Sequence, residues 1–166
     1  MGGVAKIRVI KKRVEELIPY CRNSRTHSDA QVAQIAASIR EFGFINPVLI
    51  DAENNIIAGH GRVLAARKLG LEEVPCVLHD HLTETQRKAY ILADNKLALN
   101  AGWDEDMLRL ELGELGDMGF DLELTGFDEV EVEALNHNVN IDDFFSDREG
   151  EVPKEPKLCP HCGGVL

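Results

Sequence analysis

The sequence has no stretch near the roughly 20 consecutive apolar residues that a membrane-spanning helix needs, so we expect no membrane partner. Its first residues, Met-Gly-Gly-Val-Ala-Lys, lack the apolar core of a secretory signal peptide. Its four cysteines are too scattered for a disulfide framework: Cys21 and Cys76 stand alone, and Cys159 and Cys162 lie together near the end of the chain. Isolated cysteines fit a reducing compartment, and we expect a cytoplasmic protein.

Basic residues are also scarce, since 18 Lys and Arg stand against 29 Asp and Glu, which gives a net charge of −11. The imbalance is confined to one part of the chain. Residues 1–100 carry 14 Lys and Arg against 11 Asp and Glu, whereas residues 101–166 carry 4 against 18. Duplex binding without sequence preference needs clustered cations on the phosphates. Charge alone therefore leaves DNA open as a partner.

What the sequence does have is ample apolar content, 44 % of its residues, in patterns that indicate secondary structure. Alternating or continuous apolar runs predict strands over 7–10, with a following extension over 14–18, and over 47–51, 56–58 and 74–79. Helical spacing predicts helices over 28–42, 61–69, 83–99, 104–115 and 128–135. Ser28 with Gln31, and Thr83 with Gln86, have the spacing of capping boxes. The prediction is an α+β fold, a small mixed sheet with interleaved helices followed by a helical subdomain.

The most informative segment is Gly-His-Gly-Arg at positions 59–62, where an expected strand passes into a helix. Glycine lets the backbone approach a bound group closely, and a helix start offers unpaired N–H donors that suit a phosphate. Arg62 lies in the first turn, where its guanidinium can hold the same phosphate. The alternative is a tight turn with a solvent-exposed arginine, because the spacing matches neither a Walker loop nor a Rossmann fingerprint.

Two other groups are candidate metal ligands. His79 and His81 lie two residues apart with no third ligand nearby, so structural or surface histidines are the favoured interpretation. Residues 159–163, Cys-Pro-His-Cys-Gly, have the form of a zinc-ribbon knuckle. Tetrahedral zinc needs four ligands, and Cys159 and Cys162 supply two. Zinc binding there would need His161, a partner or a second knuckle to complete the site.

Four stretches, taken in order, resemble the ParB/sulfiredoxin superfamily: Asn23–Arg25, Ser28–Val48, Gly59–Ala66 and Ala93–Lys96. More narrowly, the chain is similar to the ParB-like N-terminal domain of phage and prophage DNA modification methylases. The features typical of that subgroup are Ile57–Arg62, Leu69–Leu71, Ala93–Asn100 running into Trp103, and Thr125–Phe127. The similarity covers residues 5–136.

The resemblance implies a nucleotide site. In chromosome-partition ParB proteins, a Gly-Glu-Arg-Arg turn and a Glu-Asn pair on a later helix hold CTP and its magnesium ion. Gly59 and Arg62 match the ends of that turn, and Asp94 and Asn95 match the pair. Arg25 matches a basic residue of an early loop. Asp94 is thereby the expected magnesium ligand, since Mg²⁺ favours one or two carboxylates plus phosphate oxygens. The alternative is a solvated helix carboxylate.

This sequence departs from the ParB pattern inside the turn, where His60 and Gly61 replace a glutamate and an arginine. The resemblance therefore implies neither cytidine specificity nor hydrolysis, and we expect a nucleoside triphosphate, ATP or CTP, with Mg²⁺. His60 and Gly61 are still included among the expected nucleotide-binding residues. The catalytic cysteine of sulfiredoxins has no counterpart here, so reductase chemistry is not expected.

These observations predict a DNA-associated nucleotide-binding module linked to DNA modification, phage or plasmid functions. Candidate partners are DNA, a DNA methyltransferase, another phage protein and a second copy of the chain. Two alternatives stay open: a ParB-like metal-dependent nuclease, or an acidic adaptor without catalysis. A weak NTPase activity is also open, whereas the catalytic loop of an amino-methyltransferase is absent from the sequence. The expected division is a nucleotide-binding core over 5–80, a helical subdomain over 81–136 that completes the site, an acidic linker over 137–158 and the partial knuckle over 159–166.

Overall fold

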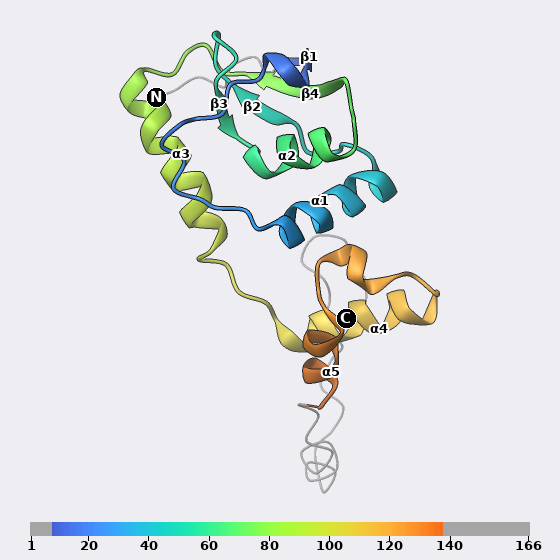
Figure 1. Ribbon diagram of the computed structural model, residues 1–166. Helices are drawn as coiled ribbons and strands as arrows, with labels where there is room; N and C mark the ends of the chain where they lie inside the picture. Colours follow the sequence, from blue (N-terminus) through green and yellow to red (C-terminus); the bar gives the residue numbers. More distant parts are fainter. Residues whose placement is uncertain (1–7, 138–166) are drawn as a thin grey trace, which may run out of the picture.

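The computed structural model describes residues 8–137 and shows a mixed sheet with helices on one face and at one edge (Figure 1). The elements follow the order β1 (Val9–Arg13), η1 (Val14–Glu16), α1 (Asp29–Phe42), β2 (Val48–Ile50), β3 (Ile56–Ala58), α2 (His60–Lys68), β4 (Glu73–Leu78), α3 (Glu84–Ala98), α4 (Glu105–Asp117), η2 (Leu122–Thr125) and α5 (Glu129–His137). This arrangement confirms the predicted α+β class.

The sheet has the strand order β1-β4-β2-β3. Strand β4 pairs antiparallel with β1 and parallel with β2, and β2 pairs antiparallel with β3. The first strand was predicted over 7–10, but it runs to Arg13 because residues 9–13 pair with 73–77 of β4. The partner of Arg13 that sets this boundary, Glu73, is 60 residues away in sequence.

The core has two layers of apolar contact. The first joins the sheet to α2 and includes residues that are almost fully buried: Leu17, Val48, Ile50, Ile56, Val63, Val74 and Cys76. The second joins α2 to α1 through Val32, Ala36 and Ala65. Helix α2 is thus enclosed between the sheet and α1, which fixes the position of its first turn (Figure 1).

The last two helices form a separate layer beside α1. Phe42 at the end of α1 stacks on Phe120, with the ring centroids 5.9 Å apart, and η2 also contacts α1. Trp103 packs edge-to-face on Phe127 and so ties the start of this layer to its end. Among residues 8–137, no helix is both long and apolar enough to cross a membrane.

Helix starts follow their capping residues closely. Thr83 and Gln86 form the expected reciprocal capping box. At Ser28 only half of the box forms, because the Ser28 hydroxyl accepts from the Gln31 amide at 3.1 Å while the Gln31 side chain bonds to His27 instead. The predicted box is therefore wrong in its second half, and the reason is a competing acceptor–donor pair with His27.

Candidate functional site

The first turn of α2 is shaped by Gly59, which is the N-cap and has φ = +99°. This left-handed conformation strains residues other than glycine. A β-carbon at Gly59 would also lie 2.8 Å from Nη2 of Arg62. Glycine is therefore required here for its backbone angle, and its lack of a side chain leaves space for the guanidinium that folds back over the helix start.

Arg62 is held in this position by a hydrogen bond from Nη2 to the Pro47 carbonyl at 3.1 Å. Its Nε is buried and has no hydrogen-bond partner within residues 8–137. Burial lowers the pKa of Arg62, and the nearby negative charge of Asp94 acts in the opposite direction. A guanidinium stays charged in spite of such a shift. The site thus contains a desolvated cation with an unsatisfied donor.

A cavity of about 210 Å³ lies in front of this helix start. It is lined by every residue that the sequence analysis assigned to the nucleotide and magnesium site: Arg25, Gly59, His60, Gly61, Arg62, Asp94 and Asn95. The structure brings these seven residues together around one cavity, and their roles are proposed below. These seven residues come from three elements: the loop before α1, the start of α2, and the last turns of α3.

The loop and α3 are joined at the rim of the cavity. Arg25 donates from Nη1 to the Asn95 carbonyl at 3.4 Å, and the Asn95 side chain donates to the Ile91 carbonyl at 2.8 Å. Asp94 is exposed, and its Oδ1 accepts from the Tyr90 hydroxyl at 3.5 Å. Burial, with Asp94 as a further cause, raises the pKa of Tyr90. Asp94 therefore presents a solvent-facing carboxylate opposite Arg62.

Helix α3 is fixed to the sheet by a polar cluster at its other end. Arg87 forms an ion pair with the buried carboxylate of Asp51, which also accepts from the Asn55 amide at 2.8 Å and the Asn55 side chain. Burial alone would raise the pKa of Asp51, but the bonds from Asn55 and Arg87 together lower it. Because Arg87 is committed to Asp51, it is not part of an exposed basic face of α3.

Two histidines line the cavity in different ways. Nε2 of His60 accepts from the Tyr20 amide at 3.2 Å, which tethers the early loop to α2. Nδ1 of His27 bonds to Oε1 of Gln31 at 2.9 Å. The cavity is also lined by three residues that were not predicted from the sequence: Asn23, His27 and Gln31. No sequence pattern points to His27, because its proximity to Gly61 is evident only in the structure.

Because Nε2 of His60 accepts a hydrogen bond from the Tyr20 amide, we expect the protein to lose stability in mild acid. Burial, aided by the charge of His27, lowers the pKa of His60 in the folded state. The unfolded chain then binds more protons as the pH falls below the ordinary histidine pKa, so stability present at neutral pH is lost toward pH 5. We expect a lower Tm at pH 5.5 than at pH 7.5, and a smaller difference in His60→Gln, whose amide oxygen still accepts from Tyr20. An equal difference in both proteins, measured by circular dichroism, would contradict this.

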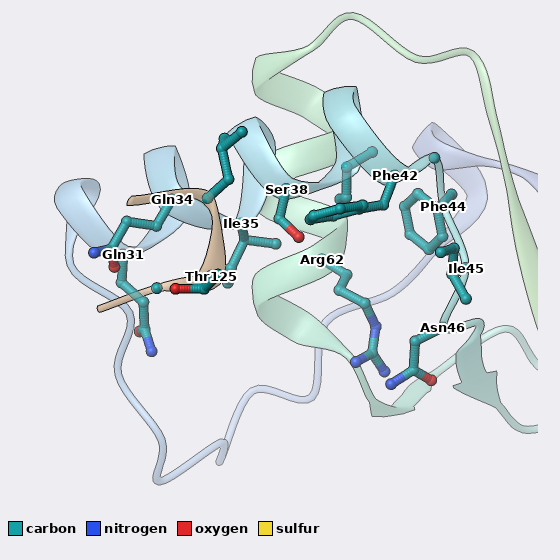
Figure 2. A pocket seen from close by; sticks show the side chains of 14 residues that line it. Gln31, Gln34, Ile35, Ser38, Phe42, Phe44, Ile45, Asn46, Arg62 and Thr125 are labelled. Carbon is teal, nitrogen blue, oxygen red and sulfur yellow. The ribbon is translucent and has the colours of Figure 1, made fainter. Parts of the chain in front are cut away.

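A second cavity of about 470 Å³ adjoins the first (Figure 2). Its walls come from α1, the loop over residues 43–46 and the 124–126 segment at the end of η2. Arg62 projects into it from α2 beside Asn46 (Figure 2). Gln31, Ile35 and Arg62 line both cavities, so the two spaces share a wall at the centre of the site.

The other candidate metal ligands are not assembled into a site in the described part of the chain. The rings of His79 and His81 are 5.6 Å apart, but residues 8–137 contain no group of three or more His, Cys, Asp or Glu that could hold a metal ion. Cys159 and Cys162, and nearly all of the expected acidic linker, lie outside the described residues.

In this chain a strand of a mixed sheet leads into a glycine-flanked helix start at a charged cavity, and a later helix lies at the rim of that cavity. This arrangement defines the ParB/sulfiredoxin class of domains. The comparisons with known proteins agree. Residues 4–95 match the profile of the ParB N-terminal domain, and residues 106–160 match that of the ParB-methyltransferase HTH domain. The chain belongs to the ParB N-terminal domain family.

Relatives and solved structures support this assignment. The chain is 48 % identical over 83 residues to the ParB-like nuclease domain-containing protein YnaK of Escherichia coli, covering 50 % of this chain and 95 % of YnaK. It is 37 % identical over 71 residues to the nucleoid occlusion protein of Bacillus cereus, covering 40 % of this chain but only 24 % of that protein. The fold is similar to a truncated ParB of Caulobacter crescentus in complex with CTP-gamma-S, with a TM-score of 0.63, 21 % identity, and 77 % and 76 % of the two chains covered.

Proposed function

We propose that this chain is a DNA-associated cytoplasmic module that binds a nucleoside triphosphate with Mg²⁺ at the start of α2. The observation that carries this proposal is the convergence of Arg25, Arg62 and the Asp94–Asn95 pair on one cavity in front of a glycine-flanked helix N-terminus. These groups come from three elements that are far apart in sequence. The Caulobacter protein of similar fold, which was crystallised with a CTP analogue, supports the same assignment.

The chemistry of the cavity suits a polyphosphate. The open amides at the start of α2 and the guanidinium of Arg62 give hydrogen-bond donors and positive charge in the same small space. Buried donors are nearly always satisfied in folded proteins, and the unpaired Nε of Arg62 is an exception that an anionic ligand would resolve. Arg25 adds a second cation at the rim. The phosphate groups are therefore assigned to the smaller cavity.

A magnesium ion fits the remaining feature of this cavity. Asp94 offers one exposed carboxylate opposite the cationic wall. Mg²⁺ is commonly held by one or two protein carboxylates together with substrate phosphates and water, so a cluster of protein ligands is not required. When bound, the ion would neutralise phosphate charge beside Asp94.

The adjoining cavity has the size and chemistry for a nucleoside. Its apolar wall includes Ile35, Phe42 and Phe44, and polar side chains around it include Gln34, Ser38 and Asn46. Ligand pockets are typically apolar with a few polar groups that fix orientation. Because Arg62 lies between the two cavities, a nucleotide can span them with its phosphates on one side and its base on the other.

A calorimetric screen tests this function directly. We expect the full chain to bind at least one of ATP, CTP, GTP or ADP in the presence of Mg²⁺, with a triphosphate preferred over ADP. Asp94→Asn should lose most of the magnesium dependence of that binding, while His81→Ala, an exposed histidine that does not line the cavity, should behave as wild type. If the chain binds none of the four nucleotides, the proposed function is wrong.

The DNA-associated part of the proposal depends on the second half of the chain. The match of residues 106–160 to the ParB-methyltransferase HTH domain and the similarity to nucleoid occlusion proteins support DNA or a DNA methyltransferase as the partner. The basic residues of α3 give less support, because Arg87 pairs with Asp51 and Lys88 pairs with Glu84. Fluorescence anisotropy with duplex DNA, with and without the nucleotide found in the screen, tests this part separately.

A metal-dependent nuclease is the second candidate, favoured by the name of the relative YnaK. Such enzymes usually gather several carboxylates around one or two ions. Asp94 is the one carboxylate lining the proposed site, and residues 8–137 hold no cluster of three metal-ligand side chains. A plasmid-nicking assay with Mg²⁺ or Mn²⁺ distinguishes the two functions: nicking that disappears in Asp94→Ala supports the nuclease, and equal nicking by both proteins indicates contamination.

A further inference from the structure

Gly61 is a glycine with negative φ inside α2, so its backbone does not explain why it is glycine. Its surroundings do. A β-carbon at position 61 would lie 2.9 Å from Cε1 of His27 and 3.0 Å from Cδ1 of Ile35. Real β-carbons essentially never have contacts below 3.0 Å. The His27 ring therefore occupies the space that any side chain at position 61 would enter.

The position of His27 is also fixed from the other side. Its Nδ1 bonds to Oε1 of Gln31 at 2.9 Å, the bond that replaces the second half of the expected capping box. With a carbonyl oxygen as acceptor, Nδ1 carries the hydrogen, and Nε2 is the ring nitrogen left for a ligand. His27 is half-buried and lines the cavity at the start of α2. The ring is thus held in place and has one nitrogen to offer.

We infer that His27 is a polyphosphate-binding residue that acts in place of a cation at position 61, and that His27 and Gly61 are a matched pair. This inference rests on the proposed function, because it assigns a contact within the same site. His60 is less suited to the role, since its Nε2 already accepts from the Tyr20 amide. A phosphate oxygen accepts from Nε2 of His27 only when both ring nitrogens carry hydrogen, so the contact is made by an imidazolium.

The electrostatic setting of His27 in the cavity is defined by few groups. The loop contributes Arg25, α2 contributes His60 and Arg62, and α3 contributes Asp94, whereas α1 contributes only uncharged residues. Two of these four groups, Arg25 and Arg62, are cations. A bound polyphosphate compensates their mutual repulsion.

The test compares four proteins by calorimetry with Mg²⁺ and the nucleotide that wild type binds best: wild type, His27→Ala, Gly61→Arg and the double variant. His27→Ala should bind about tenfold more weakly, the effect of one charge-assisted hydrogen bond. Gly61→Arg should have a lower Tm and weaker binding because its side chain meets His27. The double variant should recover both, since the guanidinium then enters the space that the ring has left.

The outcomes separate this inference from the proposed function. If wild type binds no nucleotide, the proposed function and this inference both fail. If wild type binds and His27→Ala binds equally well, His27 is not a ligand-binding residue and only the inference fails. A double variant no better than Gly61→Arg, in either Tm or affinity, would overturn the matched pair. His81→Ala serves as the histidine control and should match wild type throughout.

Discussion

Replacing Arg62 by alanine is expected to weaken triphosphate binding by about a hundredfold, which is the loss of a bidentate, charge-assisted contact in a desolvated site. Arg62 is the one side chain that lines both cavities and also carries an unsatisfied buried donor. Its removal therefore affects the phosphate and nucleoside sides of the site together. Calorimetry in Mg²⁺ measures the effect, and circular dichroism reports whether the fold is kept.

Two further substitutions make this result specific. Arg62→Lys keeps a positive charge but loses the planar fork, so its affinity should lie between those of wild type and Arg62→Ala. Arg67→Ala removes an arginine from the same helix that does not line either cavity and bonds only weakly to the Leu17 carbonyl, at 3.5 Å. It should bind as wild type does. Equal affinity in Arg62→Ala and Arg67→Ala would show that the guanidinium of Arg62 has no part in binding.

Local features of this fold were predictable because their causes are local. The helix starts at Ser28 and Thr83 were predicted from capping residues, and both helices begin one residue after them. The second expected helix was predicted to begin at Gly61 but begins at His60, because Gly59, in a left-handed conformation, is its N-cap. Strand bounds were less predictable, because long-range pairing with β4 determines where β1 ends.

Most residues of the site could be predicted from the sequence, but their arrangement in space could not. The Gly59–Arg62 and Asp94–Asn95 segments are each contiguous, but nothing in their periodicity places α3 beside the start of α2; the family resemblance suggested that they meet. His27 could not be found in this way, because an isolated histidine has no spacing pattern. The role of His27 depends on the missing side chain at Gly61, and only the structure shows that these two residues lie close together.

The position of α3 depends on the ion pair between Asp51 and Arg87, and this pair joins residues 36 positions apart that no sequence pattern connects. No pattern in the sequence indicates a role for Asp51. In the structure its carboxylate is buried and accepts from the backbone of Glu53 and Asn55 as well as from Arg87. Because Asp94 lies two turns further along the same helix, this pair also holds the rim of the nucleotide site.

Asp51→Ala is therefore expected to lower the free energy of unfolding by about 3–5 kcal/mol, since removing one partner of a buried pair leaves the other charge uncompensated. That corresponds to a fall in Tm of roughly 10 °C or more. Glu84→Ala, which removes the exposed pair with Lys88 on the same helix, is the matched control and should leave the free energy of unfolding nearly unchanged. Similar losses of the free energy of unfolding in both variants, measured by urea denaturation, would contradict a stabilising role for the buried Asp51–Arg87 pair.

A double variant, Asp51→Ala with Arg87→Leu, tests whether the ion pair positions α3, apart from the cost of leaving one buried charge without its partner. Removing both partners should recover part of the stability lost in Asp51→Ala, because the uncompensated guanidinium and its buried, unpaired Nε are gone. It should not recover nucleotide affinity, since α3 still lacks the bond that fixes Asp94 opposite Arg62. Stability regained without binding would show that the ion pair positions the site. Binding regained along with stability would mean that Ile91, the buried residue of α3, is enough to place that helix.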